Sequence, residues 1–167
     1  MSTTLCFDFG NTRRKVAVFN NSELDKVIIL KDDADETIRS LVDNFNADKS
    51  ILSSVIDHNP GMEILLSAKT SFHKLNHLTK LAFKTPVGKP ETIGADRLAL
   101  TAAAVHFYPT SNNLVIGLGT CITYNFINKY HELTGGAISP GLEMRLKSLH
   151  HFTAKLPLVE ADISGAC

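Results

Sequence analysis

A run of eight residues near the amino end of this 167-residue chain combines an acid, a glycine, small polar side chains and three cations. It joins two apolar segments and consists of Asp8, Phe9, Gly10, Asn11, Thr12, Arg13, Arg14 and Lys15. Apolar segments on both sides of a short polar one predict a strand, a tight turn and a second strand. The turn has the groups that bind a nucleoside triphosphate: backbone N–H groups that glycine leaves accessible, Asp8 for hydrated Mg²⁺, and Lys15 for phosphate charge. An ordinary hairpin with a polar turn is the alternative.

A second group of chemically useful residues lies at the start of an alanine-rich segment, 94–107, that we expect to be helical. The motif is Glu91-Thr92-Ile93-Gly94-Ala95-Asp96-Arg97. Asp96 can accept a proton from an attacking alcohol, and the helix dipole favours its ionised form. The planar guanidinium of Arg97 matches the two oxygens of a carboxylate. The alternative is a capped helix that carries a surface arginine.

The pattern of strand, turn and strand returns later in the chain, where Gly117-Leu118-Gly119-Thr120 lies between two more apolar segments. Its N–H groups and the Thr120 hydroxyl can hold a terminal phosphate. No acid occupies position 117, so this turn brings no metal ligand of its own. The repeat predicts two related halves that face a cleft.

Strands and helices are expected to alternate along the chain, which predicts an α/β fold with a mixed sheet. Beyond the two hairpins, apolar patterns predict strands at 25–30 and 51–55 and helices at 37–42 and after residue 141. Residues 62–77 fit either a helix or a strand with a helix, and the glycine-rich segment 135–141 predicts a tight loop. A linker at 108–113 divides the chain into halves of residues 1–110 and 111–167.

Composition limits the classes of protein to which the chain can belong. Apolar residues make up 44% of the chain and charged residues 20%, as in soluble globular proteins. Seventeen basic residues balance seventeen acidic ones, which gives no electrostatic reason to expect a nucleic acid partner. The chain has three cysteines without a spaced pair, no signal-peptide pattern, and no apolar run approaching the roughly 18 residues of a membrane span. We therefore expect a cytoplasmic protein with no membrane partner.

Taken in order, the three groups resemble the motifs of the type III pantothenate kinase family, within the superfamily of acetate and sugar kinases, Hsp70 and actin. The matching segments are 8–12 with Lys15 for the first phosphate motif, 94–97 for the substrate motif, and 119–120 with Thr123 for the second phosphate motif. Residues 135–141 and 153–157 resemble the segment that follows that motif. The matches span nearly the whole chain.

The resemblance implies a ribonuclease-H-like, or actin-like ATPase, fold with a mixed sheet, flanking helices and an incomplete second half. It implies a homodimer in which the γ-phosphoryl group of ATP moves to the terminal hydroxyl of pantothenate, the first step toward coenzyme A. Carried over by position, the residues from Asp8 to Lys15 would bind ATP together with Thr120, and Asp8 would hold Mg²⁺ through water. The pantothenate-binding residues would be Gly94, Ala95, Asp96 and Arg97, with Asp96 as the general base.

Two features depart from the family pattern. The family's second phosphate motif begins with an aspartate that helps to bind a monovalent cation, K⁺ or NH₄⁺, and here Gly117 occupies that position; Asn125 also stands where an acid is usual. Family members are substantially longer, so we expect a C-terminally truncated second half. These departures keep open a non-catalytic or impaired protein that dimerises or binds ligands on the kinase scaffold. A ribonuclease-H-like nuclease ranks lower, because only Asp8 and Asp96 are plausible carboxylates for two metals.

Overall fold

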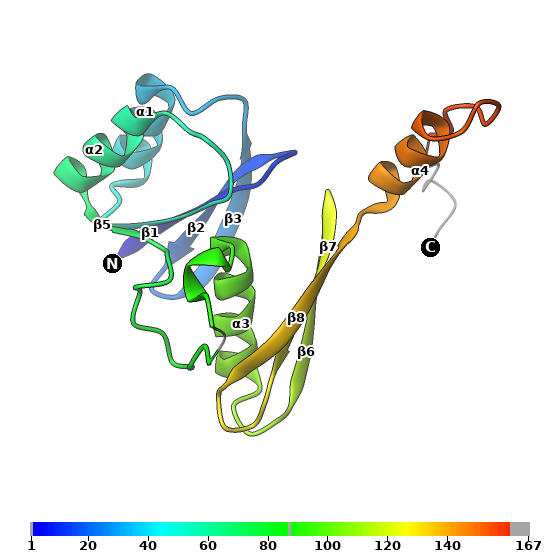
Figure 1. The fold of residues 1–167 in the computed structure, drawn as a ribbon. Helices are drawn as coiled ribbons and strands as arrows, with labels where there is room; N and C mark the ends of the chain where they lie inside the picture. Colours follow the sequence, from blue (N-terminus) through cyan, green and yellow to red (C-terminus); the bar gives the residue numbers. More distant parts are fainter. Residues whose placement is uncertain (1, 87, 161–167) are drawn as a thin grey trace. The chain divides into compact units, whose positions relative to one another are not determined.

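The computed structural model describes residues 2–86 and 88–160 (Figure 1). These residues divide into two compact units. The first unit takes the chain up to Leu81 together with Gly88–Ala102, and the second takes a short segment beginning at Ala82 and the chain from Ala103 onward. The division falls inside a helix, α3 (Ala95–Phe107), whereas the sequence predicts a boundary after residue 110.

Five strands in the described part of the first unit form one mixed sheet, in the order β3-β2-β1-β4-β5. Their bounds are β1 (Thr3–Phe9), β2 (Arg14–Asn20), β3 (Glu23–Leu30), β4 (Lys49–Ser54) and β5 (Ser71–Lys74). The first three strands pair antiparallel, while β4 runs parallel to both β1 and β5. This order, with helices between the later strands, is the ribonuclease-H-like arrangement, so the predicted fold class is confirmed.

Local sequence explains how these elements begin and end. The β2–β3 turn consists of Asn21 and Ser22, both with positive φ, which is the geometry that matches the twist of a hairpin. Helix α1 (Asp35–Phe45) ends at Asn46, which adopts the left-handed conformation. Helix α2 (Pro60–Lys69) begins where the Asn59 side chain accepts a hydrogen bond from Gly61 N. Segment 62–77 is therefore a helix followed by a strand.

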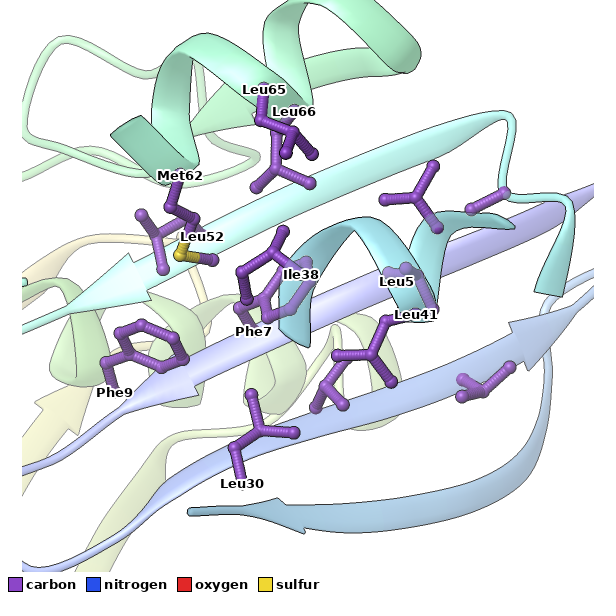
Figure 2. Packing of buried hydrophobic residues seen from close by; sticks show 14 residues of the cluster. Leu5, Phe7, Phe9, Leu30, Ile38, Leu41, Leu52, Met62, Leu65 and Leu66 are labelled. Atoms are coloured by element: carbon purple, nitrogen blue, oxygen red, sulfur yellow. The ribbon is translucent and has the colours of Figure 1, made fainter. Parts of the chain in front are cut away.

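The core of the first unit lies between one face of the sheet and helices α1 and α2, which lie side by side (Figure 1). Alternate residues of β1 point into this core, and α1 and α2 cover them with apolar side chains (Figure 2). Its most deeply buried members include Leu5, Phe7, Phe9, Val16, Val18, Ile38, Leu52, Met62 and Leu66. Because side chains alternate along a strand, Asp8 emerges on the opposite face, held in place by the two buried phenylalanines that flank it.

The second unit contains three antiparallel strands among its described residues, in the order β6-β7-β8. They are β6 (Asn113–Leu118), β7 (Cys121–Ile127) and β8 (Leu133–Pro140), followed by α4 (Leu142–His151). The prediction of a loop at 135–141 is wrong, because β8 pairs with β7 along this segment as far as Pro140. Pairing with a neighbouring strand has outweighed the weak strand preference of its glycines.

No helix within the described ranges is long and apolar enough to cross a membrane.

Candidate nucleotide and substrate site

The turn that we expect to bind phosphate, residues 10–13, is a short loop between the paired strands β1 and β2. We call it the first phosphate turn. Gly10 N donates a hydrogen bond to Arg13 O at 3.1 Å, which closes the turn, and the side chains of Asn11, Thr12 and Arg13 are exposed. A methyl group on Gly10 would lie 3.6 Å from Arg13 O, which is an ordinary van der Waals contact. The fold itself therefore does not require this glycine, whose lack of a side chain lets a ligand approach the backbone of the turn closely.

The two charged side chains at the base of this turn face each other across the hairpin. Asp8 and Lys15 are register partners, and Lys15 Nζ lies 3.3 Å from Asp8 Oδ2. Their side chains are 52% and 42% exposed, so water weakens this ion pair and either group can exchange its partner for a ligand. The structure thus brings the Asp8 carboxylate and the Lys15 ammonium group together at the base of the turn.

Arg14, by contrast, is engaged elsewhere. It precedes Lys15 on β2 and so lies on the other face of the sheet, where its Nε is 3.5 Å from Asp33 Oδ1. Its guanidinium also lies 6.0 Å from the centre of the Phe9 ring. Of the two cations at the start of β2, the structure therefore places Lys15, and not Arg14, beside Asp8.

The predicted substrate motif starts α3, and its glycine has a steric role. Gly94 O accepts hydrogen bonds from the N–H groups of Arg97 and Leu98, which begins the helix. The Asp96 carboxylate folds back over Gly94, so that a methyl group there would collide with Asp96 Oδ1. The same methyl group would lie 3.6 Å from Val55 Cγ1, which places the start of α3 against the residue that follows β4.

Val55 links this motif to the phosphate turn within the first unit. Its N–H donates a hydrogen bond to Phe9 O at 3.0 Å, and Phe9 is the residue between Asp8 and Gly10. The carboxyl ends of the parallel strands β1 and β4 meet at one edge of the sheet. Asp8 and the start of α3 therefore lie at the same end of the first unit's sheet, where phosphoryl-transfer chemistry would need them.

A partly buried polar network next to this edge was not predicted from the sequence. His58 Nε2 lies 2.8 Å from Glu63 Oε1, and its Nδ1 lies 3.0 Å from Ser54 Oγ. Lys74 Nζ donates to the same Glu63 oxygen at 2.6 Å, and the hydrogen bonds from Lys74 and His58 lower the pKa of Glu63. The His58 ring packs edge-on against Phe9, so this network supports the end of β1. Its members come from a strand, a loop, a helix and a second strand, and no spacing in the sequence joins them.

The second turn, in the other unit, depends on Gly141, which follows Thr120 by 21 positions in the chain. Thr120 O accepts a hydrogen bond from Gly141 N at 2.9 Å. A methyl group on Gly141 would collide with the carbonyl oxygens of Gly119 and Thr120. Gly141 therefore lets the amino end of α4 lie against the Gly119–Thr120 turn. The glycine-rich composition of 135–141 was the only sequence signal for this contact.

Gly117 and Asn125, the two positions at which an acid was expected, lie close together in the second sheet. Gly117 and Thr123 are register partners, so the position opposite Thr123 carries no side chain. Asn125 is fully buried, and its Nδ2 lies 3.4 Å from Val115 O. An amide can donate that hydrogen bond while a carboxylate cannot, which explains why an uncharged residue is stable there.

The donor set suits a hydrated cation better than a cage of protein ligands. No group of three or more His, Cys, Asp or Glu side chains with metal-binding geometry occurs among the described residues. Mg²⁺ usually keeps several waters and binds one or two carboxylates plus substrate phosphates. The half-exposed Asp8 carboxylate beside an open phosphate turn fits that mode of binding.

Together, the strand order of the first sheet and the helices that flank it define an α/β protein of the ribonuclease-H-like, or actin-like, fold. The family model for type III pantothenate kinase matches residues 4–166, and the chain belongs to this family.

Individual relatives agree with this assignment. The chain is 50% identical to a type III pantothenate kinase from Christiangramia forsetii, over 93% of this chain and 65% of the relative. It is 38% identical to one from Flavobacterium johnsoniae, over 95% of this chain and 66% of the relative. The chain thus spans just under two thirds of the length of these curated relatives.

A solved structure of a conserved Baf family protein from Campylobacter jejuni is similar in fold. It superposes with a TM-score of 0.54 at 23% identity, covering 89% of this chain and 60% of that one. At this level of identity the likeness concerns the fold alone.

Proposed function

We propose that the chain transfers the γ-phosphoryl group of ATP to the terminal hydroxyl of pantothenate, as the names of its relatives indicate for them. The observation that carries the proposal is the chain of contacts from Asp8 and Phe9 through Val55 to Gly94. It joins a turn suited to polyphosphate and a motif suited to an alcohol with a carboxylate, at one end of one sheet.

Each residue has a defined task in this proposal. The turn from Gly10 to Arg13 holds the polyphosphate, Lys15 moves from Asp8 to a phosphate oxygen, and Thr120 is a further ATP contact. Asp8 would hold Mg²⁺ through water, and the ion would supply positive charge that offsets the phosphates. Asp96 accepts the proton of the pantothenate hydroxyl, and Arg97 pairs with the pantothenate carboxylate.

The proposal extends to the setting in which the protein works. We expect the protein to act in the cytoplasm, and the resemblance to the family implies a homodimer. Gly117 has no side-chain donor for K⁺ or NH₄⁺, so we expect a monovalent cation to bind there more weakly than it would to an aspartate.

A second candidate function is supported by that same position. A scaffold that binds nucleotide or pantothenate without turnover would result if the charge missing at Gly117 is essential for catalysis. Loss of one charged contact at a transferring phosphate commonly reduces the rate about a hundredfold or more.

A coupled ADP-release assay with ATP, MgCl₂, KCl and pantothenate separates the two candidates. ADP release that requires pantothenate supports the kinase. Nucleotide binding without pantothenate-dependent ADP release supports the impaired scaffold if Gly117→Asp restores turnover. Rapid ADP release at the same rate with and without pantothenate, unchanged by Gly117→Asp, would contradict both.

A further inference from the structure

Ser53 occupies a position beside Asp8 that none of the motifs includes. Ser53 on β4 and Lys15 on β2 are both register partners of Asp8 on β1. Register partners on neighbouring strands point to the same face of a sheet, so Lys15, Asp8 and Ser53 form a row across three strands. The row lies on the face opposite the core, at the edge where Val55 lies next to Gly94.

The hydroxyl of Ser53 is buried and has no hydrogen bond. Ser53 is 8% exposed, and its Oγ is one of two buried side-chain polar atoms without a hydrogen-bond partner among the described residues. Ser50, on the same strand and 2% exposed, is different, because its Oγ lies 2.6 Å from Thr70 Oγ1. An unsatisfied buried hydroxyl destabilises a fold. Because this one lies beside the proposed phosphate site, a hydrogen-bond acceptor that reaches Ser53 Oγ when a ligand is bound would be the partner that it lacks.

Asp8 can become that partner by a side-chain rotation. Neighbouring strands are about 4.8 Å apart, so rotation of Asp8 away from Lys15 and toward β4 brings a carboxylate oxygen within reach of Ser53 Oγ. Lys15 would leave Asp8 when a phosphate competes for its ammonium group, because polyphosphate carries more charge than one carboxylate. The carboxylate then lacks a donor on its Lys15 side and has one available on its Ser53 side.

We infer that Ser53 is a positioning residue, which donates a hydrogen bond to Asp8 when nucleotide and Mg²⁺ are bound and so aims the carboxylate at the hydrated ion. The ligand-free chain keeps Asp8 on Lys15, and the loaded chain exchanges Lys15 for Ser53. This inference rests on the proposed function, since it requires Asp8 to hold the cation of a bound nucleotide.

The test compares Ser53→Ala, Ser53→Thr and Ser50→Ala in the full 167-residue chain. Binding of ADP is measured by calorimetry with MgCl₂ and again with EDTA, and Tm is measured without ligand. Ser53→Ala should keep or raise Tm, because it removes an unsatisfied buried hydroxyl, and it should reduce the Mg²⁺-dependent gain in ADP affinity about tenfold. Ser53→Thr should restore that gain. Ser50→Ala should lower Tm and leave the gain unchanged.

Three results would overturn the inference. If Ser53→Ala lowers Tm as much as Ser50→Ala does, the hydroxyl has a structural partner without ligand. If wild-type chain and Ser53→Ala show the same Mg²⁺-dependent gain, Ser53 does not position Asp8, while the proposed function stands. If the wild-type chain shows no Mg²⁺-dependent binding of ADP, the proposed function fails and the role of Ser53 fails with it.

Discussion

The two phosphate turns have similar sequences but differ in charge and in support. Across the first hairpin, Asp8 faces Lys15, and at the corresponding place in the second hairpin Gly117 faces Thr123. The first turn extends from a sheet that α1 and α2 cover with a buried core. On β6, which enters the second turn, the alternate residues Leu114, Ile116 and Leu118 are 59%, 48% and 81% exposed.

In the proposed function, the first unit therefore supplies the charged groups and the second unit supplies uncharged ones. The first turn has the charges that a metal and a polyphosphate need, and its geometry is fixed by its own unit's core. The second turn offers N–H groups and a hydroxyl, and its geometry is fixed by a backbone contact with Gly141.

The largest expected effect is on stability. Leu52→Ala in β4 removes a fully buried side chain and should lower the free energy of unfolding by about 2–5 kcal/mol. Ile116→Ala in β6, where the side chain is half exposed, should change it by less than about 0.5 kcal/mol. Urea unfolding followed by circular dichroism measures both. Equal losses would mean that the β6 face is covered in solution and that the two units do not differ in this way.

The charge difference between the turns is tested by Asp8→Asn. This variant removes the carboxylate that we assign to hydrated Mg²⁺, so kcat/KM for ATP should fall about 10²–10³-fold. Asp25→Asn is the matched control, because Asp25 is an exposed acid of the same sheet that pairs with Lys26. A control variant that loses as much activity as Asp8→Asn, or an Asp8→Asn variant that keeps full activity, would remove the assignment.

Gly94 and Gly141 are both positions where an added methyl group would collide with a neighbouring atom, but we expect alanine to have different effects at the two. Gly141 has φ −69°, so only its contact with backbone oxygens opposes alanine, and Gly141→Ala should cost about 1–3 kcal/mol of stability. Gly94→Ala meets the movable end of Asp96, so it should preserve stability while lowering turnover by displacing the carboxylate. Thermal unfolding and ADP release distinguish the two. A Gly94→Ala variant with normal turnover would show that the observed position of Asp96 is not the working one.

The smallest effect is the pH dependence of the Glu63 network. Hydrogen bonds from Lys74 and His58 lower the pKa of Glu63 in the folded chain below its ordinary value of 4.5. The stabilisation is therefore complete above that value and is lost as pH falls through the lowered folded pKa. Because Glu63 is partly exposed, Glu63→Gln should cost less than about 1 kcal/mol at neutral pH, and the difference from wild type should shrink in acid. A difference that grows as pH falls below 4.5 would contradict this sign.

Local patterns in the sequence predicted the elements that local interactions determine. The first hairpin and the helix at 94–107 appear as β1, β2 and α3, because apolar alternation and alanine content act over short distances. The segment 135–141 is a strand and not a loop, because its partner β7 lies elsewhere in the chain.

In the candidate site, too, the sequence predicted what is local and missed what depends on tertiary contacts. Its motifs were visible as contiguous residues, whereas Ser53, His58 and Gly141 matter through contacts with residues of other elements. Ser53 shows this most clearly, since nothing near it in the sequence marks it, and only strand register places it beside Asp8. Register and tertiary contact are what a single sequence expresses least directly.

The most direct test of the account is a paired measurement on Asp96→Asn, namely binding of Mg²⁺–ATP and pantothenate-dependent ADP release. The account predicts that ATP affinity stays within about twofold of wild type while the rate of release falls about 10²–10⁴-fold, because the base is lost and the phosphate turn is intact. Turnover close to the wild-type rate, or loss of ATP binding together with turnover, would contradict the assignment of proton acceptance to Asp96 and of ATP binding to the turn that begins at Asp8.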